Sequence, residues 1–335
     1  MIDHPDQRSS HKSSTPTMAG VSFFLVLIFL LNIIYVWDTE QIGISLIAAT
    51  ALMFAIGLKD DLVVSTPRAK IIGEIMAILI VIFCNCLQVN SLQGFLGIQE
   101  VSIFLSSGIV VIMILTIINA YNMIDGIDGL ASGIGIVIFG VYGFLFYIAS
   151  AYFYFLLCLG LIGILLAYLR YNLSLTKKIF MGDTGSLIIG FCIGFLSLKF
   201  LAMDTSELAK YAFKNENKFI IIGAIFFIPL FDTLRVICVR LLNKKSPFKP
   251  DNNHIHHILI NRGLTHLKAS MFLCFLNLLI AITLIILSTN FGSYIMLGFM
   301  MLYFVFFLVV FHLLKINIGK KSHFKHAISV FQSLF

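Results

Sequence analysis

Long apolar runs separated by short polar stretches constrain the fold of this chain more than any other feature of its sequence. An α-helix needs about 20 consecutive apolar residues to cross the hydrocarbon core of a bilayer. The residues are 59% hydrophobic and only 12% charged, far from the composition of water-soluble domains. We therefore predict an all-α polytopic integral membrane protein with about ten transmembrane helices. The runs lie at residues 20–37, 42–57, 71–88, 101–118, 131–149, 152–170, 185–202, 219–242, 269–289 and 292–314.

Little of the chain is left for a water-soluble part. We expect a single membrane-embedded domain over residues 1–335, with a polar cytoplasmic tail at residues 1–19 and a basic cytoplasmic tail at residues 315–335. All six cysteines fall inside apolar runs, where a free thiol behaves as a small hydrophobic side chain. Neither a disulfide framework nor a thiolate metal site is therefore expected.

The distribution of Lys and Arg predicts how the chain is oriented. Nearly all of them lie in the two tails and in the connections after the even-numbered runs, whereas the opposite loops hold only Lys210, Lys214 and Lys218. Cytoplasmic loops of membrane proteins carry an excess of positive charge, so both termini are predicted to be cytoplasmic. The net charge of +7 follows from this asymmetry and calls for no nucleic-acid partner.

The unusual polar residues collect on that same side. The predicted cytoplasmic stretches are HKSSTPTMAG (11–20), GLKDDL (57–62), NAYNMIDGIDGLASG (119–133), RYNLSLTKKIFMGDTGS (170–186) and NKKSPFKPDNNHIHHILINRG (243–263). The opposite loops are short or carry no comparable cluster. We therefore expect active-site loops, and the chemistry of the protein, at the cytoplasmic surface of the membrane.

The third cluster has the spacing of a metal site. Asn119, Asn122, Asp125 and Asp128 follow one another at intervals of three, and residues three apart are neighbours on a helix. Such a row drifts around an α-helix, and a tighter 3₁₀-like turn, which the interleaved glycines permit, would align it better. Hard oxygen donors suit Mg²⁺ or Mn²⁺. A helix end merely capped by Asn and Asp is the open alternative.

Two further acidic positions point to phosphate chemistry. Asp60 and Asp61 are adjacent, so both ionise freely only if a cation or hydrogen bonds compensate, although a solvated loop end is the open alternative. Asp183 lies in the Gly-Asp-Thr-Gly-Ser segment that opens the seventh run, where a helix N-terminus offers free amides to an anion. Asp183 could hold a metal that bridges this anion, or it could be only an N-cap.

Three histidines and one span add less specific signals. His254, His256 and His257 lie near Lys249 and Arg262, which favours phosphate binding or proton exchange. Zinc fits less well, because no Cys or carboxylate accompanies them at structural-zinc spacing. No role is expected for His266. In the eighth run, Pro229 predicts a kink, and Asp232 with Arg235 forms either a structural ion pair or part of a lateral entrance for a lipid chain.

These motifs, in this order, resemble the polyprenyl-phosphate N-acetylhexosamine-1-phosphate transferases. The likeness covers KSSTPTMAG, GLKDD, NAYNMIDGIDGLASG, FMGDTGS and SPFKPDNNHIHH, from about residue 3 to residue 265. It implies transfer of a sugar 1-phosphate from a UDP-sugar to a membrane polyprenyl phosphate, with release of UMP. The PDNNHIHH form resembles the undecaprenyl-phosphate GlcNAc-1-phosphate transferase branch. The muramyl-pentapeptide branch, which usually has three consecutive histidines, stays an alternative.

The resemblance also implies a role for each matching residue. Asn122 and Asp183 would hold Mg²⁺, or Mn²⁺ in its place. The expected catalytic residues are Asp60, Asp61, Asp125, Asp128 and His256, and the expected substrate-binding residues are Lys12, Thr17, Asn119, Asn172, His254 and His257. The lipid phosphate would attack the sugar-linked phosphorus directly, with Asp60 or Asp61 as the base that removes its last proton. The alternative is a two-step transfer that passes through a covalent aspartyl-phosphate intermediate. The sequence leaves both mechanisms open.

The implied partners are a UDP-N-acetylhexosamine, undecaprenyl phosphate and membrane lipid, in the bacterial cytoplasmic membrane, and a homodimer is left open. Family members usually have one more span before the first motif and a Gln near the position of Glu74. A secondary transporter is disfavoured because its site would lie near the midplane of the membrane. A CDP-alcohol phosphotransferase is disfavoured because the Arg and the spaced aspartates expected after DGIDGLA are missing.

Overall fold

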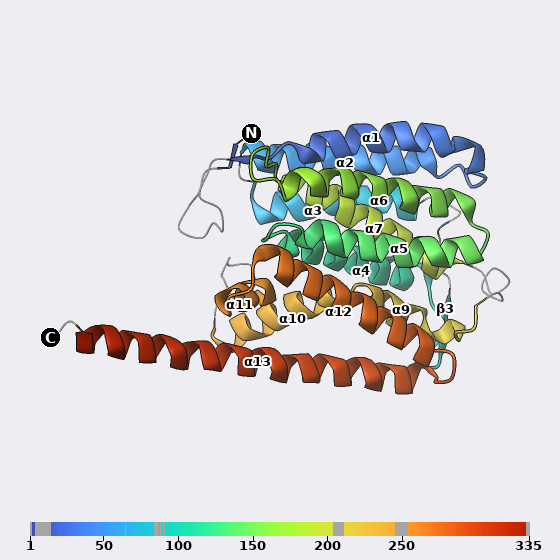
Figure 1. Cartoon of the computed structure of the whole chain (residues 1–335). Helices are drawn as coiled ribbons and strands as arrows, with labels where there is room; N and C mark the ends of the chain where they lie inside the picture. Colours follow the sequence, from blue (N-terminus) through green and yellow to red (C-terminus); the bar gives the residue numbers. More distant parts are fainter. Residues whose placement is uncertain are drawn as a thin grey trace.

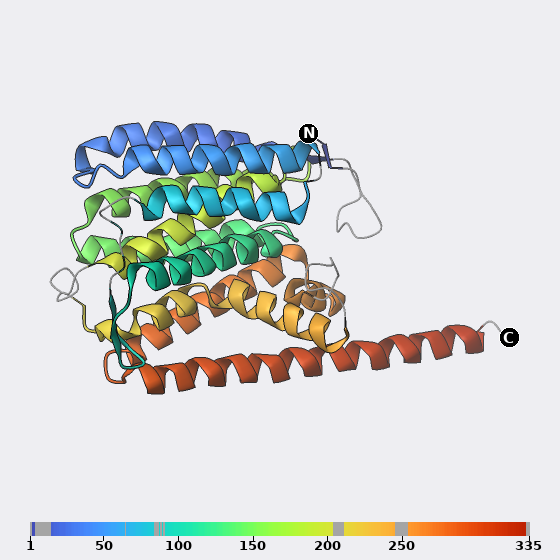
Figure 2. The same cartoon turned by 180° about the vertical axis from the view of Figure 1, so that it is seen from behind.

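Helices occupy the positions of the apolar runs in the computed structural model, which describes residues 2–3, 15–63, 65–83, 87, 89, 91–203, 211–244 and 254–332. They lie side by side in a layered bundle (Figures 1 and 2). The long helices are α1 (Ala19–Ile34), α2 (Gly43–Leu62), α3 (Pro67–Ile82), α4 (Ile103–Ile124), α5 (Leu130–Ile148), α6 (Tyr152–Asn172), α7 (Gly182–Ala202), α10 (Phe227–Leu242), α12 (His266–Leu287) and α13 (Ser293–Gln332).

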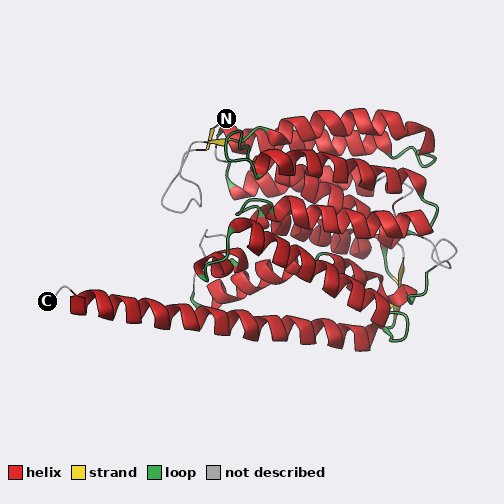
Figure 3. Ribbon diagram, viewed as in Figure 1, coloured by secondary structure: helices red, strands yellow, loops and turns green. Residues whose placement is uncertain are grey.

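Short elements complete the described part of the chain. Strand β1 (Ile2–Asp3) pairs with β2 (Thr15–Pro16), and β3 (Ser91–Phe95) pairs with β4 (Ile98–Glu100), both antiparallel. These strands are small beside the helices (Figure 3), so the all-α class is confirmed. The remaining short elements are η1 (Tyr35–Trp37), η3 (Asn215–Asn217), α9 (Lys218–Ile225) and α11 (Ile255–Asn261).

Eight helices of the described residues are long and apolar enough to cross a membrane. The pair α9 and α10 makes a ninth span if it is counted as one, although it is bent by 73°. Helix α3 occupies the third predicted run but has only 16 residues, fewer than a full crossing needs. The polytopic membrane class is therefore confirmed, whereas the count of ten is not.

Helix α7 is the centre of the bundle, and almost all of its residues are buried. Two glycines let other helices reach its first turn. A Cβ on Gly20 of α1 would lie 2.4 Å from the Gly185 nitrogen, and a Cβ on Gly57 of α2 would lie 2.4 Å from the Thr184 Cα. Any side chain at either glycine would push its helix away from α7, so both glycines fix the position of the Asp183 turn.

The break between α9 and α10 follows from Pro229. Proline has no N–H, so the carbonyl of Ile225, four residues earlier, loses its helical partner. Asn277 of α12 replaces it: its Nδ2 donates to the Ile225 oxygen over 2.8 Å, and its Oδ1 accepts from the Ile228 nitrogen over 2.9 Å. The kink predicted at Pro229 is confirmed, and its free backbone groups are satisfied by a fully buried side chain.

The two ends of the chain lie at the same end of the bundle, on the left in Figure 1. The C-terminal end of α4, the first residues of α7 and all of α11 lie there too, and α13 extends beyond the other helices. We call this the motif end. It gathers the described parts of all five polar clusters, as the sequence predicts.

Candidate active site

The metal-like motif of residues 119–128 divides between a helix and a turn. Helix α4 continues as an α-helix to Ile124, so the expected 3₁₀-like alignment is not observed. Asn119 and Asn122 lie on its last turns, and Asp125 and Asp128 lie in the turn that follows. Gly129 ends this turn with φ of +79°, a conformation that favours glycine, and α5 begins at the next residue. The chain thus reverses direction around Asp125 and Asp128.

A cluster of polar side chains from three helices surrounds Asp183. Asn122 of α4 donates to the Asp183 Oδ1 over 2.5 Å and to the Ser186 hydroxyl over 2.7 Å. The Lys70 ammonium of α3 lies 3.3 Å from the Asp183 Oδ1 and 3.1 Å from the Asp60 Oδ2. Asp60 also accepts from the backbone N–H of Ser65 over 2.7 Å. Asp60, Asn122 and Asp183 are therefore brought together, as expected.

Asp61 has a different setting from its neighbour. Its carboxylate accepts the backbone N–H of Asp183 over 2.8 Å, the N–H of Thr184 over 3.0 Å and the Thr184 hydroxyl over 2.5 Å. Asp61 thus caps the N-terminus of α7. The expectation that these amides are free for a substrate anion is wrong, because a carboxylate of the protein already holds them. A catalytic role for Asp61 stays a prediction.

The residues around Asp183 fit a divalent cation. The Lys70 ammonium, itself a cation, lies between the carboxylates of Asp60 and Asp183, which shows that the geometry places positive charge there. Asp183 keeps 36% of its side-chain surface exposed. No three His, Cys, Asp or Glu side chains among the described residues converge to hold a metal by themselves. A metal at Asn122 and Asp183 would therefore need further oxygen ligands from water or a phosphate, as Mg²⁺ commonly does.

Asp125 and Asp128 differ in their electrostatics. Burial, with the nearby carboxylates of Asp183, Asp128 and Asp61, raises the pKa of Asp125 to about 7. Burial alone would also raise the pKa of Asp128, but hydrogen bonds from His266 and Lys178 hold it below its usual value. Lys178 Nζ lies 2.7 Å and His266 Nδ1 3.1 Å from the Asp128 Oδ2. His266, for which no role is expected from the sequence, therefore lies in the site beside Asp128.

The expected substrate-binding residues have mixed settings. Asn172 is buried, accepts the Gly129 N–H over 2.7 Å and donates to the Ile179 carbonyl over 3.2 Å, so it fixes the turn after Asp128. Asn119 donates to the Glu74 carboxylate over 2.9 Å. Thr17 lies just before α1, and the preceding Pro16 carbonyl accepts the Phe180 N–H over 2.8 Å. Lys12 lies outside the described residues.

The histidine motif forms the start of α11. His256 is fully buried against the acidic turn, since a Cβ on Gly126 would lie 2.4 Å from its Nε2. His254 stacks on it with ring centroids 5.5 Å apart, and His257 tilts against it at 4.4 Å. Arg262 does not join them, because its guanidinium donates to the Leu314 carbonyl of α13. Lys249 lies outside the described residues.

Three contributors to this site were not predicted as such. From the sequence, Lys70 is only one of the positive charges next to the membrane, His266 has no expected role, and Asp232 forms either an ion pair with Arg235 or part of a lipid entrance. The ion pair is confirmed at 2.7 Å from Arg235, but Asp232 also accepts from His254. The missed signal was helical spacing, because Lys70 lies one turn from Glu74 on α3. Glu74 meets Asn119 of α4, and Lys70 meets Asp60 of α2 and Asp183 of α7.

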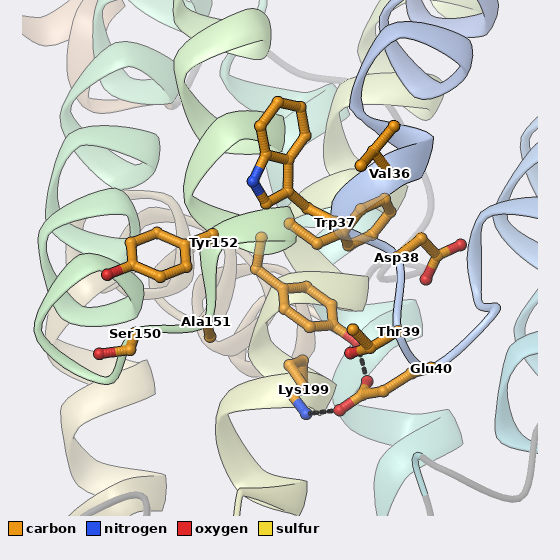
Figure 4. A pocket seen from close by; sticks show the side chains of 11 residues that line it. Val36, Trp37, Asp38, Thr39, Glu40, Ser150, Ala151, Tyr152 and Lys199 are labelled. Carbon is orange, nitrogen blue, oxygen red and sulfur yellow. Dashed lines mark hydrogen bonds and ion pairs between the residues drawn. The ribbon is translucent and has the colours of Figure 1, made fainter.

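A pocket of about 250 Å³ at the opposite end of the bundle is a weaker candidate (Figure 4). Its charged groups satisfy one another: Glu40 pairs with the Lys199 ammonium and accepts the Tyr154 hydroxyl, and Asp38 caps α2 through the Ile42 and Gly43 amides. We read this cluster as the attachment of the far end of α7. The site is at the motif end.

A groove of about 730 Å³ lies between α10 and α13, beside the motif end. Its walls are mostly apolar, and Arg235, the partner of Asp232, contributes to them. The groove therefore connects, through Arg235 and Asp232, to the histidine motif. The lipid entrance proposed for the eighth span stays a prediction.

The sequence of this chain resembles those of known proteins. A polytopic helical bundle with carboxylates, amides, lysines and histidines at one end has the polar groups that a membrane protein acting on phosphates needs. The sequence profile of Glycosyl transferase family 4 matches residues 43–201, from α2 to α7, which contain Asp60, Asp61, Asp125, Asp128 and Asp183. The chain resembles this family over that segment, which is just under half of its length.

Two relatives illustrate the likeness. The chain is 29% identical over 277 residues to the undecaprenyl-phosphate alpha-N-acetylglucosaminyl 1-phosphate transferase of Escherichia coli O157:H7. This alignment covers 80% of this chain and 71% of the relative. It is 29% identical over 291 residues to the probable undecaprenyl-phosphate N-acetylglucosaminyl 1-phosphate transferase of Bacillus subtilis strain 168, with 86% and 77% covered. Both alignments extend well beyond the family profile.

Proposed function

We propose that this protein transfers N-acetylglucosamine 1-phosphate from UDP-N-acetylglucosamine to undecaprenyl phosphate, releasing UMP, and so begins a lipid-linked glycan of the cell envelope. The observation that carries the proposal is the Lys70, Asp60, Asn122 and Asp183 cluster in a chain whose relatives are named for this transfer. The muramyl-pentapeptide alternative is not favoured, because the relatives carry the N-acetylglucosaminyl name.

The arrangement supports phosphoryl transfer at the motif end. Asn122 and Asp183 would hold Mg²⁺, which when bound would neutralise the diphosphate of the nucleotide sugar. Lys70 and Lys178 bring further positive charge to either side of the acidic turn, where they can bind phosphate oxygens. Asp61 holds α7 in place through its first amides, so the Asp183 carboxylate keeps its position beside Asn122.

Direct attack by the lipid phosphate is the mechanism we propose. Both Asp60 and Asp61 are already engaged, Asp60 by Lys70 and Ser65 and Asp61 by the amides of α7, which disfavours either as a covalent nucleophile. Incubation of the enzyme with UDP-N-acetylglucosamine alone tests this. Direct transfer gives no UMP without undecaprenyl phosphate, whereas a covalent mechanism gives a burst of one UMP for each enzyme.

The function itself is tested with purified protein in detergent. Undecaprenyl phosphate is offered with UDP-N-acetylglucosamine, UDP-N-acetylgalactosamine or UDP-N-acetylmuramyl pentapeptide, and UMP and the lipid product are measured with Mg²⁺, with Mn²⁺ and with a chelator. We expect product from UDP-N-acetylglucosamine only when a divalent cation is present. Equal turnover of the muramyl donor, or full turnover with the chelator, contradicts the proposal. The cytoplasmic location of the site and the homodimer stay predictions.

A further inference from the structure

Asp232 has three hydrogen-bond donors around a carboxylate that is 1% exposed. Its Oδ1 accepts from the Arg235 guanidinium over 2.7 Å and from the backbone N–H of Ile255 over 3.1 Å. Its Oδ2 accepts from Nδ1 of His254 over 2.8 Å. Asp232 therefore joins α10 both to the backbone of α11 and to one histidine of the motif. The two oxygens separate these tasks, since Oδ1 holds the backbone and Oδ2 holds the ring.

The bond to Oδ2 determines which nitrogen of His254 can meet a ligand. An ionised carboxylate only accepts hydrogen bonds, so Nδ1 must carry the hydrogen, and the neighbouring Arg235 keeps Asp232 ionised. The other nitrogen, Nε2, is then the one that faces any substrate. A carboxylate behind an imidazole fixes both the orientation and the hydrogen position of the ring, which is how acid–histidine pairs work in other enzymes.

His256 is less suited to the same work. It is fully buried, and neither ring nitrogen has a hydrogen-bond partner among the described residues. Burial lowers its pKa to about 3, so the ring stays neutral at physiological pH. Its contact with Gly126 makes it a spacer between the acidic turn and His254. Of the two stacked rings, only His254 is supported by a carboxylate.

We propose that Asp232 and His254 form a carboxylate–imidazole pair that presents Nε2 of His254 to a phosphate oxygen of the substrates. The inference rests on the proposed function and names the histidine that serves it. When phosphate binds, the ring takes a proton from solvent, keeps Nδ1–H on Asp232 and donates Nε2–H to the phosphate. Among the residues that the structure describes, Arg235 of α10 pairs with Asp232, and His256 of α11, which His257 contacts in turn, stacks on His254.

Asp232→Asn tests the pair without dismantling α11. The amide oxygen must stay at Oδ1, because Arg235 and Ile255 both donate there, so the new NH₂ replaces Oδ2 and donates to Nδ1. The backbone attachment is kept, but the ring is neutral with its hydrogen on Nε2. We expect α11 to stay attached, some loss of thermal stability because the buried Arg235 loses its counter-charge, and a kcat/KM lowered roughly ten- to a hundredfold, because a charge-assisted bond becomes a neutral one.

The double substitution separates this role from a structural one. His254→Gln should show a similar loss, and Asp232→Asn combined with His254→Gln should lose no more than His254→Gln alone, since Asp232 acts through the ring. Asp38→Asn, a buried carboxylate at the opposite end, is the matched control and should keep wild-type kinetics. Additive losses, or wild-type kcat/KM in Asp232→Asn, overturn the proposal.

The kinetics also identify the phosphate. A raised KM for UDP-N-acetylglucosamine with an unchanged KM for undecaprenyl phosphate assigns Nε2 to the nucleotide sugar, and the reverse assigns it to the lipid phosphate. Wild-type protein is measured in the same series. If it transfers no sugar phosphate, the proposed function fails. If it transfers normally and the variants do too, only the Asp232–His254 pair fails.

Discussion

Asp183 occupies the point where four helices meet, and its neighbours show what the side chain does. It accepts from Asn122 of α4, lies beside Lys70 of α3, and starts α7, whose first amides are held by Asp61 of α2. The carboxylate keeps 36% of its side-chain surface exposed. Its removal should therefore affect charge far more than packing.

We expect Asp183→Asn to lower turnover by at least about a hundredfold, because an amide is a much weaker ligand for a divalent cation than a carboxylate. The variant should insert and unfold like wild-type protein. Release of UMP and thermal unfolding in detergent measure the two properties. Near-wild-type turnover would show that the metal assignment is wrong. Asp38→Asn at the opposite end serves as the control for a change of Asp to Asn.

Asp125 should make the stability depend on pH. Its pKa is raised to about 7 in the folded protein, so the folded state binds this proton more tightly than the unfolded chain does. The stability that the proton contributes is fully present at acidic pH and is lost as pH rises through 7. Asp125→Asn mimics the protonated form at every pH. With a chelator present, we expect this variant to unfold a few degrees above wild type at pH 8, and the difference should shrink steadily toward pH 4, where the unfolded chain is protonated too.

The control for this prediction is the cation. Added Mg²⁺ compensates the carboxylates around Asp125, so the difference between variant and wild type at pH 8 should shrink. Thermal unfolding followed by fluorescence in the same detergent measures both conditions. A variant that is less stable than wild type at pH 8 with chelator would mean that Asp125 is held as a carboxylate by contacts stronger than its burial.

At the scale of single residues, the sequence motifs predicted which acids belong to the site better than they predicted the role of each acid. Asp60, Asn122 and Asp183 come from three distant segments, and their motifs alone placed them in one site. A lysine at a helix end is usual next to a membrane, so Lys70 by itself indicates no role, and only its spacing of one turn from Glu74 points to the inward face of α3. The capping role of Asp61 depends on how α2 meets α7, which no local pattern records.

At the scale of elements, the broken span α9–α10 shows how a polar side chain stabilises an irregular backbone. Pro229 predicted a kink, but nothing in that segment indicates which residue satisfies the backbone groups that the kink leaves open. Asn277 lies on α12, almost fifty positions later in the chain, inside a mostly apolar run. A buried polar group of this kind is tolerated inside a membrane helix because its hydrogen bonds are complete.

Asn277→Leu should destabilise the protein. The substitution leaves the N–H of Ile228 and the carbonyl of Ile225 buried without partners, and each such group costs about 1–3 kcal/mol. We expect a clear fall in the unfolding temperature, together with reduced activity, because α10 carries Asp232. Asn32→Leu is the matched control, since Asn32 is exposed on α1 and donates only to the carbonyl of Ile28. Equal stability of the two variants would contradict the role of Asn277.

At the scale of the whole molecule, the arrangement of helices separates two surfaces. The motif end collects the acids, the lysines and the histidines, and both chain ends lie there (Figures 1 and 2). The opposite end has the paired Glu40 and Lys199 and the small β3–β4 hairpin. Hydropathy predicted the helices and the one-sidedness of the motifs. It could not decide whether short α3 crosses fully, because its length of 16 residues falls between a span and a partial one.

The orientation of the molecule in the membrane gives the last prediction. Lys and Arg dominate the motif end, so this end should face the cytoplasm, where UDP-sugars are made available to the enzyme. Glu100, exposed in β4 at the opposite end, and Thr176, exposed before α7 at the motif end, are suitable reporters. A cysteine in place of Glu100 should react with a membrane-impermeant thiol reagent in intact cells, above the background of the native cysteines. A cysteine in place of Thr176 should react only after the membrane is permeabilised. The reverse pattern would place the acids outside the cell, away from the nucleotide sugar, and would contradict the orientation and the proposed donor together.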